Sequence, residues 1–337
     1  MQLGFFDWED RLKKLDKNGD PLVKLNQVIP WESFRGLLNK VRKKDKKSNA
    51  GAKPYNVVLM FKIVILQSLY NLSDEAMEYQ ILDRISFMRF LGLREGSKVP
   101  DAKTIWLFRE QLKEANLVEK LFRRFSSILR ESGFNAKKGQ IIDAIIVPVP
   151  QQHNSHKENA QIKAGEVPGE WEEAKRRQKD TDAQWAKRNG KGYYGYKNHV
   201  NVDVKYKLIR RYEVTGAAVH GNRVMGKILD GSNTNTEVYG DSAYRSREII
   251  ERLKLGGFRE RLQYKGSRGN GVSWWQKELN RKRAKIRSRV EHVFGVMAKV
   301  GGSLLARGIG IMRARVKIGL RNLAYNFNRY ALLVTMG

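Results

Sequence analysis

Three acidic residues in unlike surroundings have the types and spacing that metal-dependent phosphoryl transfer requires. Asp143 lies inside the apolar segment IIDAIIVPV, Asp241 follows EVYG, and Glu291 lies in RVEHVFG. A carboxylate in so apolar a strand must find a cation, a metal or a set of donors, because burying it unpaired is costly. Two-metal phosphoryl transfer needs hard oxygen ligands from separate elements, so that one ion activates the attacking oxygen and the other stabilises the leaving oxygen. The three acids together predict such a site.

Each acid also has an ordinary structural explanation. Asp143 could accept hydrogen bonds from neighbouring backbone amides, and Asp241 could cap a helix over residues 244–253. Glu291 could pair with Arg287, one turn earlier on an exposed helix face. Taken singly, these explanations stay open beside the metal-ligand hypothesis.

Other polar and aromatic residues near the three acids are weaker candidates. Asp203, in VNVDV, is a competing acid for which we favour a surface position near a turn. His199 and His292 flank the predicted site, and a cation that prefers oxygen leaves them a structural role or a phosphate contact. Trp274 and Trp275 could stack on a displaced base, although core or interface packing is the more common role of tryptophan.

The acids must be positioned by a mixed α/β region that begins near residue 133. Apolar, β-branched or alternating segments predict strands at Gln140–Val149, Tyr196–Asp203, Leu208–Val214 and Thr236–Tyr239. Apolar residues at helical spacing then predict a helix over 275–300 and a final amphipathic helix over 316–334. We therefore expect a catalytic domain over 133–337, with a polar insertion at about 152–192.

The region before it, residues 1–132, reads as a helical domain. Ser73 and Asp101 are expected to cap two of its helices. These two helices could form a helix-turn-helix that binds DNA, with Lys103 and Arg109 exposed, or they could belong to an ordinary helical bundle. The charge run over 42–47 is a further candidate for phosphate contact.

The composition favours a nucleic-acid partner. The chain of 337 residues has 65 Lys and Arg against 35 Asp and Glu, a formal charge of +30. A polyanion that neutralises this charge is the natural partner, and double-stranded DNA is the first candidate. Cysteine is absent, the first residues lack the apolar run that is typical of a signal peptide, and the apolar stretch over 57–70 falls short of the roughly 20 residues that span a bilayer. We expect a cytoplasmic protein with no membrane partner.

In these residues and their neighbours the chain resembles a known family, the DDE transposases of bacterial insertion sequences, of the insertion-sequence-five type within the insertion-sequence-four group. The likeness spans nearly the whole chain, including the helical N-terminal region. It is carried by the segments IDA at 142–144, KDTDA at 179–183, YGYKNH at 194–199, VTGA at 214–217, VYGDSAYR at 238–245 and RSRVEHVFG at 287–295.

The resemblance implies a ribonuclease-H-like catalytic fold, with the first Asp on the first strand, the second after the fourth strand and the Glu on a later helix. It also implies Mg²⁺-dependent hydrolysis at the transposon ends, followed by attack of the freed 3′-hydroxyl on target DNA. Carried over to this sequence, Asp143, Asp241 and Glu291 hold two Mg²⁺ ions, for which Mn²⁺ can substitute.

The same resemblance implies the residues that contact DNA. Arg287 matches the arginine of the family's tyrosine–arginine–glutamate–lysine signature and would contact a terminal phosphate. The tyrosine's place is Ala284 and the lysine's is Ala298, so either Lys299 substitutes with shifted geometry or the phosphate contact falls to Lys285 and Arg289. Further expected contacts come from basic residues of the matching segments and their neighbours, namely Lys285, Arg289, Arg245, Lys197 and His199.

Two ends must be cut together, so the resemblance implies a homodimer on DNA that binds the terminal inverted repeats and then the target. Two other functions stay open: a ribonuclease-H-like nuclease that cuts without joining, and a non-catalytic repressor derived from a transposase. The three acids count against the repressor, and the basic helical N-terminal region counts against the simple nuclease.

Overall fold

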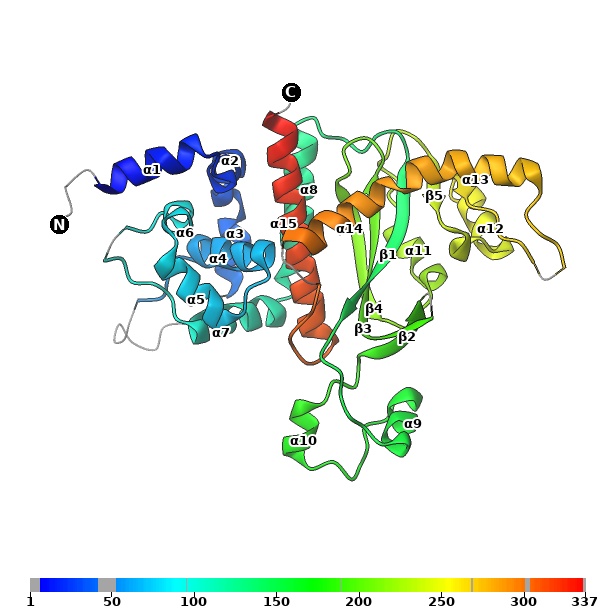
Figure 1. Ribbon diagram of the computed structural model, residues 1–337, viewed down its shortest axis with the longest axis horizontal. Helices are drawn as coiled ribbons and strands as arrows, with labels where there is room; N and C mark the ends of the chain where they lie inside the picture. Colours follow the sequence, from blue (N-terminus) through cyan, green and yellow to red (C-terminus); the bar gives the residue numbers. More distant parts are fainter. Residues whose placement is uncertain are drawn as a thin grey trace. The chain divides into compact units, whose positions relative to one another are not determined.

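Helices form nearly all of the N-terminal part of the chain in the computed structural model (Figure 1). They are α1 (Asp7–Lys17), α2 (Pro21–Val28), α3 (Arg35–Leu38), α4 (Val57–Tyr70), α5 (Asp74–Asp83), α6 (Ile85–Leu91), α7 (Ala102–Glu114) and α8 (Leu117–Glu131), with 3₁₀ turns η1 (Trp31–Phe34) and η2 (Asn39–Val41). Ser73 and Asp101 cap α5 and α7 as predicted, accepting from the N–H of Ala76 at 3.1 Å and of Thr104 at 2.7 Å. These bonds satisfy amides that a helix start leaves unpaired.

The structure describes residues 7–41, 53–94, 96–188, 190–267, 269–300 and 304–335. They divide into two compact units, the first made of Met1–Ile128, Val300–Gly302 and Leu320–Gly337, the second of Leu129–Lys299 and Ser303–Gly319. The helical unit therefore includes the end of the last helix, α15 (Ile311–Thr335), which the expected division at residue 132 assigned to the catalytic domain. The charge run over 42–47 lies outside the described residues.

Aromatic packing explains why the end of α15 belongs to the helical unit. Phe327 is fully buried and meets Phe125 edge-to-face, with ring centroids 4.5 Å apart. The rings of Trp31, Phe34 and Phe61 also lie within 6.2 Å of the Phe327 ring. Aromatic side chains bury the largest areas in a core, so this cluster decides which unit the helix joins.

No single helix among the described residues is long and apolar enough to span a membrane. Only α4 and α5 taken together are long and apolar enough, and the two helices are bent by 103° relative to one another. Most of the α4 side chains are buried inside the helical unit, so the apolar character of this helix is explained by its place in the core.

The second unit is built on one mixed sheet. Its strands are β1 (Gln140–Pro148), β2 (Gln184–Arg188), β3 (Lys191–Asp203), β4 (Ile209–Gly216), β5 (Glu237–Gly240) and β6 (Arg259–Leu262). The order is β2-β3-β1-β5-β6, and β4 pairs with β3. β3 is antiparallel to β1, β2 and β4, whereas β5 is parallel to β1 and β6.

The four predicted strands are confirmed as β1, β3, β4 and β5, and β3 begins several residues earlier than expected. The edge strands β2 and β6 were not predicted, because their sequences QWAKR and RERL are short and charged. β2 lies within the expected polar insertion, so Asp241 follows the fifth strand of this sheet and not the fourth.

Helices cover both faces of the sheet. On one face Ile142 packs with Met225 of α11 (Met225–Ile228) and Ile249 of α12 (Arg247–Leu255). On the other face Val147 and Tyr196 pack with Ile318 from the first half of α15. This alternation along β1 follows from the two-residue period of a strand.

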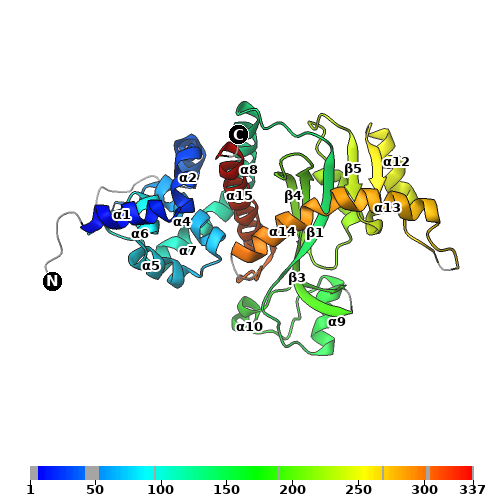
Figure 2. The same ribbon diagram turned by 45° about the horizontal axis from the view of Figure 1, so that its top comes forward.

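Two helices follow one another across the sheet, nearly in one line (Figures 1 and 2). They are α13 (Trp274–Arg287) and α14 (Arg289–Val300), where the sequence predicts one helix over 275–300. The break is at Ser288, whose N–H is shared between two carbonyls of the preceding turn. Within the expected insertion, α9 (His156–Ala164) and α10 (Glu173–Gln178) protrude from one end of the sheet (Figure 1).

Candidate active site

Asp143 and Asp241 are brought together by neighbouring parallel strands. β1 and β5 pair at Gln140–Val238 and Ile141–Tyr239, and β1 continues past Asp143 to Pro148 without β5 beside it. β5 ends at Gly240, so Asp241 stands beside the open edge of β1. The carboxyl ends of parallel strands are where α/β sheets collect their ligands.

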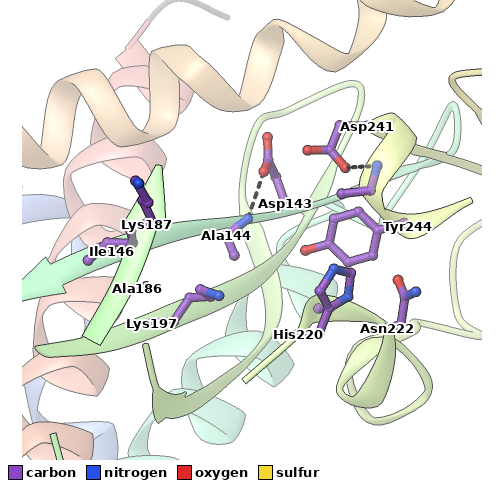
Figure 3. A pocket seen from close by; sticks show the side chains of 12 residues that line it. Asp143, Ala144, Ile146, Ala186, Lys187, Lys197, His220, Asn222, Asp241 and Tyr244 are labelled. Atoms are coloured by element: carbon purple, nitrogen blue, oxygen red, sulfur yellow. Dashed lines mark hydrogen bonds between the residues drawn. The ribbon is translucent and has the colours of Figure 1, made fainter. Parts of the chain in front are cut away.

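Both carboxylates line one cavity of about 190 Å³ in the second unit (Figure 3). Their side chains point toward one another in Figure 3, with the ring of Tyr244 below them. The lining is completed by residues of β1, β2, β3 and the loops at η3 (Gly221–Arg223) and η4 (Ser242–Tyr244), namely Ala144, Ile146, Ala186, Lys187, Lys197, His220, Gly221, Asn222 and Ala243.

Both acids line the cavity, and both also accept a hydrogen bond from a backbone amide. Asp143 Oδ1 accepts from the N–H of Ala144 at 2.8 Å. Asp241 Oδ1 accepts from the N–H of Ala243 at 2.9 Å and caps the short turn η4. The expected helix over 244–253 begins only at Arg247, so the cap belongs to η4 and not to that helix. Each acid is thus held in one orientation by a backbone amide.

Glu291 is the third predicted ligand, and an arginine separates it from the other two. The Arg287 guanidinium donates to Asp143 Oδ2 at 2.9 Å and to Glu291 Oε1 at 2.6 Å. The Glu291 side chain is 59% exposed on α14. In the described part of the chain, no three acidic or imidazole side chains gather closely enough to ligate one ion. The structure therefore joins two of the three acids and connects the third through Arg287.

The two aspartates fit a divalent cation in type and in charge. Carboxylate oxygens are the hard donors that Mg²⁺ and Mn²⁺ prefer. Burial raises the pKa of the Tyr244 phenol, and the negative charges of Asp143 and Asp241 raise it further. Both carboxylates thus act on one point of the cavity, which is the electrostatic condition for holding a cation.

Gly221 keeps the cavity floor close to Tyr244. A Cβ added to Gly221 would lie 2.5 Å from the Tyr244 ring. Any larger residue at this position would push the ring away and change the surface beneath the two carboxylates.

Two of the basic residues expected at DNA are used inside the protein, which corrects those expectations. Arg109 is not exposed: it donates to Asp74 at 2.8 Å and to Gln67 at 2.7 Å within the helical unit. Arg245 forms an ion pair with Glu260 and donates to the carbonyl of Leu262 at 2.9 Å. Both guanidiniums are satisfied by charged partners.

His199 and Asp203 also need correction, because both are completely buried in the sheet. The His199 ring bonds Thr215 Oγ1 at 3.0 Å, and burial lowers its pKa to about 4, with Lys197 and His220 adding to the shift. His199 is therefore a neutral structural residue without access to a phosphate. Asp203, expected at the surface, accepts from two backbone amides of its own turn.

The other predicted contacts are accessible. Lys103, Lys285, Arg289 and His292 are exposed on α7, α13 and α14, and Lys197 is half-buried at the cavity. Arg289 donates to the carbonyl of Val204 at 2.8 Å. The side chain of Lys299 lies outside the described residues. Trp274 and Trp275 are 81% and 60% exposed, so neither has the core role that is usual for tryptophan.

Lys187, His220, Asn222 and Tyr244 line the cavity and were not predicted as site residues. The dipeptide NG at 189–190 is a sequence typical of hairpin turns, and it could have indicated β2 and with it Lys187. His220 directly precedes the turn η3 and Asn222 lies within it. Nothing in their local sequence points to a site.

Two known sequence families match this chain. The family described as "Transposase domain (DUF772)" matches residues 9–111, and the family described as "Transposase DDE domain" matches residues 135–327. The chain belongs to the transposase DDE domain family. The expectation of a DDE transposase is thereby confirmed, and the family implies the use of a divalent metal in general.

Solved structures of other transposases are also similar to this transposase. A cryo-EM structure of the piggyBac transposase synaptic complex with hairpin DNA has 11% identity and a TM-score of 0.47, covering 94% of this chain and 76% of that chain. The crystal structure of the Mos1 strand transfer complex has 14% identity and a TM-score of 0.17, covering 77% of this chain and 82% of that chain. At these values the assignment rests on the sequence families.

Proposed function

We propose that this transposase cleaves DNA at the ends of an insertion sequence and joins the freed 3′ ends to target DNA. The observation that carries the proposal is the convergence of Asp143 and Asp241 from neighbouring parallel strands into one cavity. Such converging carboxylates are what metal-assisted phosphoryl transfer needs. The family match supplies the reaction class.

Asp143 and Asp241 would hold the metal, which we infer to be Mg²⁺, two ions per site, with Mn²⁺ as a substitute. When bound, the metal lowers the pKa of the attacking oxygen and stabilises the leaving oxygen. Glu291 is the third ligand in this proposal. It becomes available once Arg287 gives up its contacts to Asp143 and Glu291.

Arg287 has two tasks in this proposal. Without a bound cation, its guanidinium balances the charges of Asp143 and Glu291. If Asp143 and Glu291 held a metal, their charge would be balanced by it, and the Arg287 guanidinium could bind a phosphate of the DNA end instead. Arginine suits this exchange, because its planar donors match carboxylate and phosphate equally well.

The sheet supports the ribonuclease-H-like fold. Three antiparallel strands, β4, β3 and β1, are followed by parallel β5 and β6, with the first acid on β1 and the last on α14. In our proposal the second unit carries out the chemistry, while the helical unit recognises the terminal inverted repeats and takes part in dimerisation.

The charge of +30 supports DNA as the partner of both units. We infer an enzyme of the insertion-sequence-five type that works as a homodimer on DNA, because two ends must be joined together. A bacterial cytoplasm, at the nucleoid, is the location that fits these substrates.

A strand-transfer assay with the element's own terminal repeats and Mg²⁺ tests the proposal. Joined products should form with the wild type and disappear in Asp241→Ala, while DNA binding survives because the variant removes no basic residue. Glu251→Ala, which removes an exposed acid of α12 outside the cavity, is the matched control and should keep full activity.

Other outcomes would replace the proposal. Cleavage without joined products in the wild type would indicate a ribonuclease-H-like nuclease. DNA binding without cleavage under any divalent metal would indicate a repressor. Unchanged joining in Asp241→Ala would show that the acids of this cavity are not the active site.

A further inference from the structure

Across the cavity from the two aspartates lie three basic side chains that come from different segments. Lys187 is on β2, Lys197 on β3, and His220 in the loop that precedes η3. Figure 3 shows Asp143 and Asp241 at the top of the cavity and Lys197 and His220 below, with the Tyr244 ring between His220 and Asp241. Lys187 is at the left, above Ile146. The cavity thus has an acidic side and a basic side.

The basic side is held in place by the sheet. β2 pairs with the start of β3, and this antiparallel hairpin places Lys187 opposite Gly192, next to the cavity. Lys197 donates to the carbonyl of Val219 at 2.9 Å, and this bond fixes the loop that carries His220. Backbone pairing and this bond therefore hold the segments that carry the basic side chains beside the cavity.

Lys187 lies at the edge of the cavity, where its ammonium group can meet a ligand. It is exposed, and within the described part of the chain it makes no ion pair. Lys157 and Lys175 of the insertion, by comparison, pair with Glu170 and Glu158. An unpaired ammonium group at the edge of a cavity can bind an anion without first breaking a contact.

The size and charges of the cavity select a phosphate group. Its volume of about 190 Å³ is below the roughly 300–1,000 Å³ of pockets that hold drug-sized ligands. An anion alone would be repelled by the two aspartates, so the basic side chains opposite must supply the attraction. A metal ion at the acidic side and a phosphodiester at the basic side together match this charge distribution.

From this arrangement we propose that Lys187 and His220 bind the scissile phosphate of the DNA end, opposite Asp143 and Asp241. Lys187 is supplied by the β2–β3 hairpin, which gives this part of the insertion a role in positioning the reacting phosphate. The inference rests on the proposed DNA chemistry for the identity of the phosphate. It concerns binding, which can be measured apart from cleavage.

The test compares two duplexes that carry the terminal repeat, one native and one with a neutral methylphosphonate at the scissile position. Affinities are measured by fluorescence anisotropy without divalent metal, so that no cleavage occurs. Lys187→Ala should weaken binding of the native duplex about tenfold, the size expected for one charge-assisted hydrogen bond. On the neutral duplex the loss should be about twofold or less, because the interacting charge has been removed from the DNA.

Two further variants sharpen this comparison. His220→Gln should show the same pattern with a smaller loss, and Lys187→Arg should keep most of the affinity. Lys191→Ala removes an equal charge from an exposed position of the same hairpin that does not line the cavity. Its effect should be the same on both duplexes.

The outcomes separate this inference from the proposed function. Equal losses for Lys187→Ala on both duplexes, or no loss on either, would overturn the phosphate contact even if the wild type cuts and joins DNA. A loss confined to the native duplex would support the contact even if the wild type fails to cut, in which case the proposed chemistry would fall instead.

Discussion

Two buried acids on neighbouring strands, Asp203 and Asp143, have very different surroundings. Asp203 accepts from the N–H of Tyr206 at 2.7 Å, from the N–H of Leu208 at 3.2 Å and from Arg210 at 3.1 Å, and the side chain is completely buried. All three donors lie within seven residues of it. Asp143 faces a cavity, and its cationic partner Arg287 comes from a helix far along the chain.

The difference separates a structural acid from a functional one. Burial raises the pKa of Asp203, and Arg210 with the two amides opposes that shift, so the turn itself supports the charge. Asp143 depends on a guanidinium that also contacts Glu291 and stands beside a space open to ligands. An acid with movable partners at a cavity can exchange them for a metal, whereas an acid enclosed by its own turn cannot.

The largest effect is expected from removing the charge of Asp143. Asp143→Asn should lower strand transfer by about a thousandfold to ten-thousandfold, because the lost metal contact stabilises the transition state by several kcal/mol. The free energy of unfolding should change by no more than about 1 kcal/mol, since no core packing is lost. Joining assays and urea unfolding on the same preparation measure both. A large loss of stability would mean that Asp143 is a structural acid, as Asp203 is.

Asp203→Ala should behave in the opposite way. Removing one partner of a buried ion pair leaves Arg210, whose side chain is only 6% exposed, without its carboxylate. The free energy of unfolding should fall by about 3–5 kcal/mol. Strand transfer per folded molecule, assayed well below the unfolding temperature, should stay near the wild-type level. A loss of activity in a fully folded variant would contradict the comparison.

His199 is a third buried polar side chain of the same sheet, and it is neutral at pH 7. Its pKa is about 4 in the folded protein, against an ordinary 6.5. Between these values the unfolded chain binds a proton that the folded protein does not, so the free energy of unfolding should fall as pH decreases, by about 3 kcal/mol from pH 7 to pH 4.

Urea unfolding at several pH values checks this expectation. His199→Gln can keep the bond to Thr215 without titrating, and it should lose less stability over that window than the wild type does. The neighbours Lys197 and His220 are present in both proteins, so they do not account for the difference. Parallel pH profiles would mean that folding does not lower the pKa of His199.

The smallest effect concerns Arg287. Arg287→Gln removes a positive charge between Asp143 and Glu291, so Mn²⁺ should bind the DNA-free protein about tenfold more tightly, roughly 1.4 kcal/mol. Joining should nevertheless decrease, because the variant lacks the proposed phosphate contact. Mn²⁺ binding followed by electron paramagnetic resonance, with Arg289→Gln as the control, measures the first effect. Weaker Mn²⁺ binding would mean that Arg287 supports the ligands and does not compete with the cation.

Much of this protein is already determined by its sequence. The apolar run around Asp143, the turn after Val238–Gly240 and the caps at Ser73 and Asp101 depend on neighbouring residues, and they appear in the structure as predicted. The excess of positive charge follows from composition alone. Local physics is enough for these features, because a cap or a buried strand needs only its own segment.

Tertiary structure decided what depends on segments that meet only after folding. Nothing near Arg287 shows that it would contact Asp143, and nothing near His199 shows that the sheet would enclose it. Lys187 and His220 reach the cavity only because β2 pairs with β3 and the loop before η3 packs beneath Tyr244. Burial and long-range ion pairs depend on which surfaces pack together, and the spacing of residues along the chain does not predict that packing.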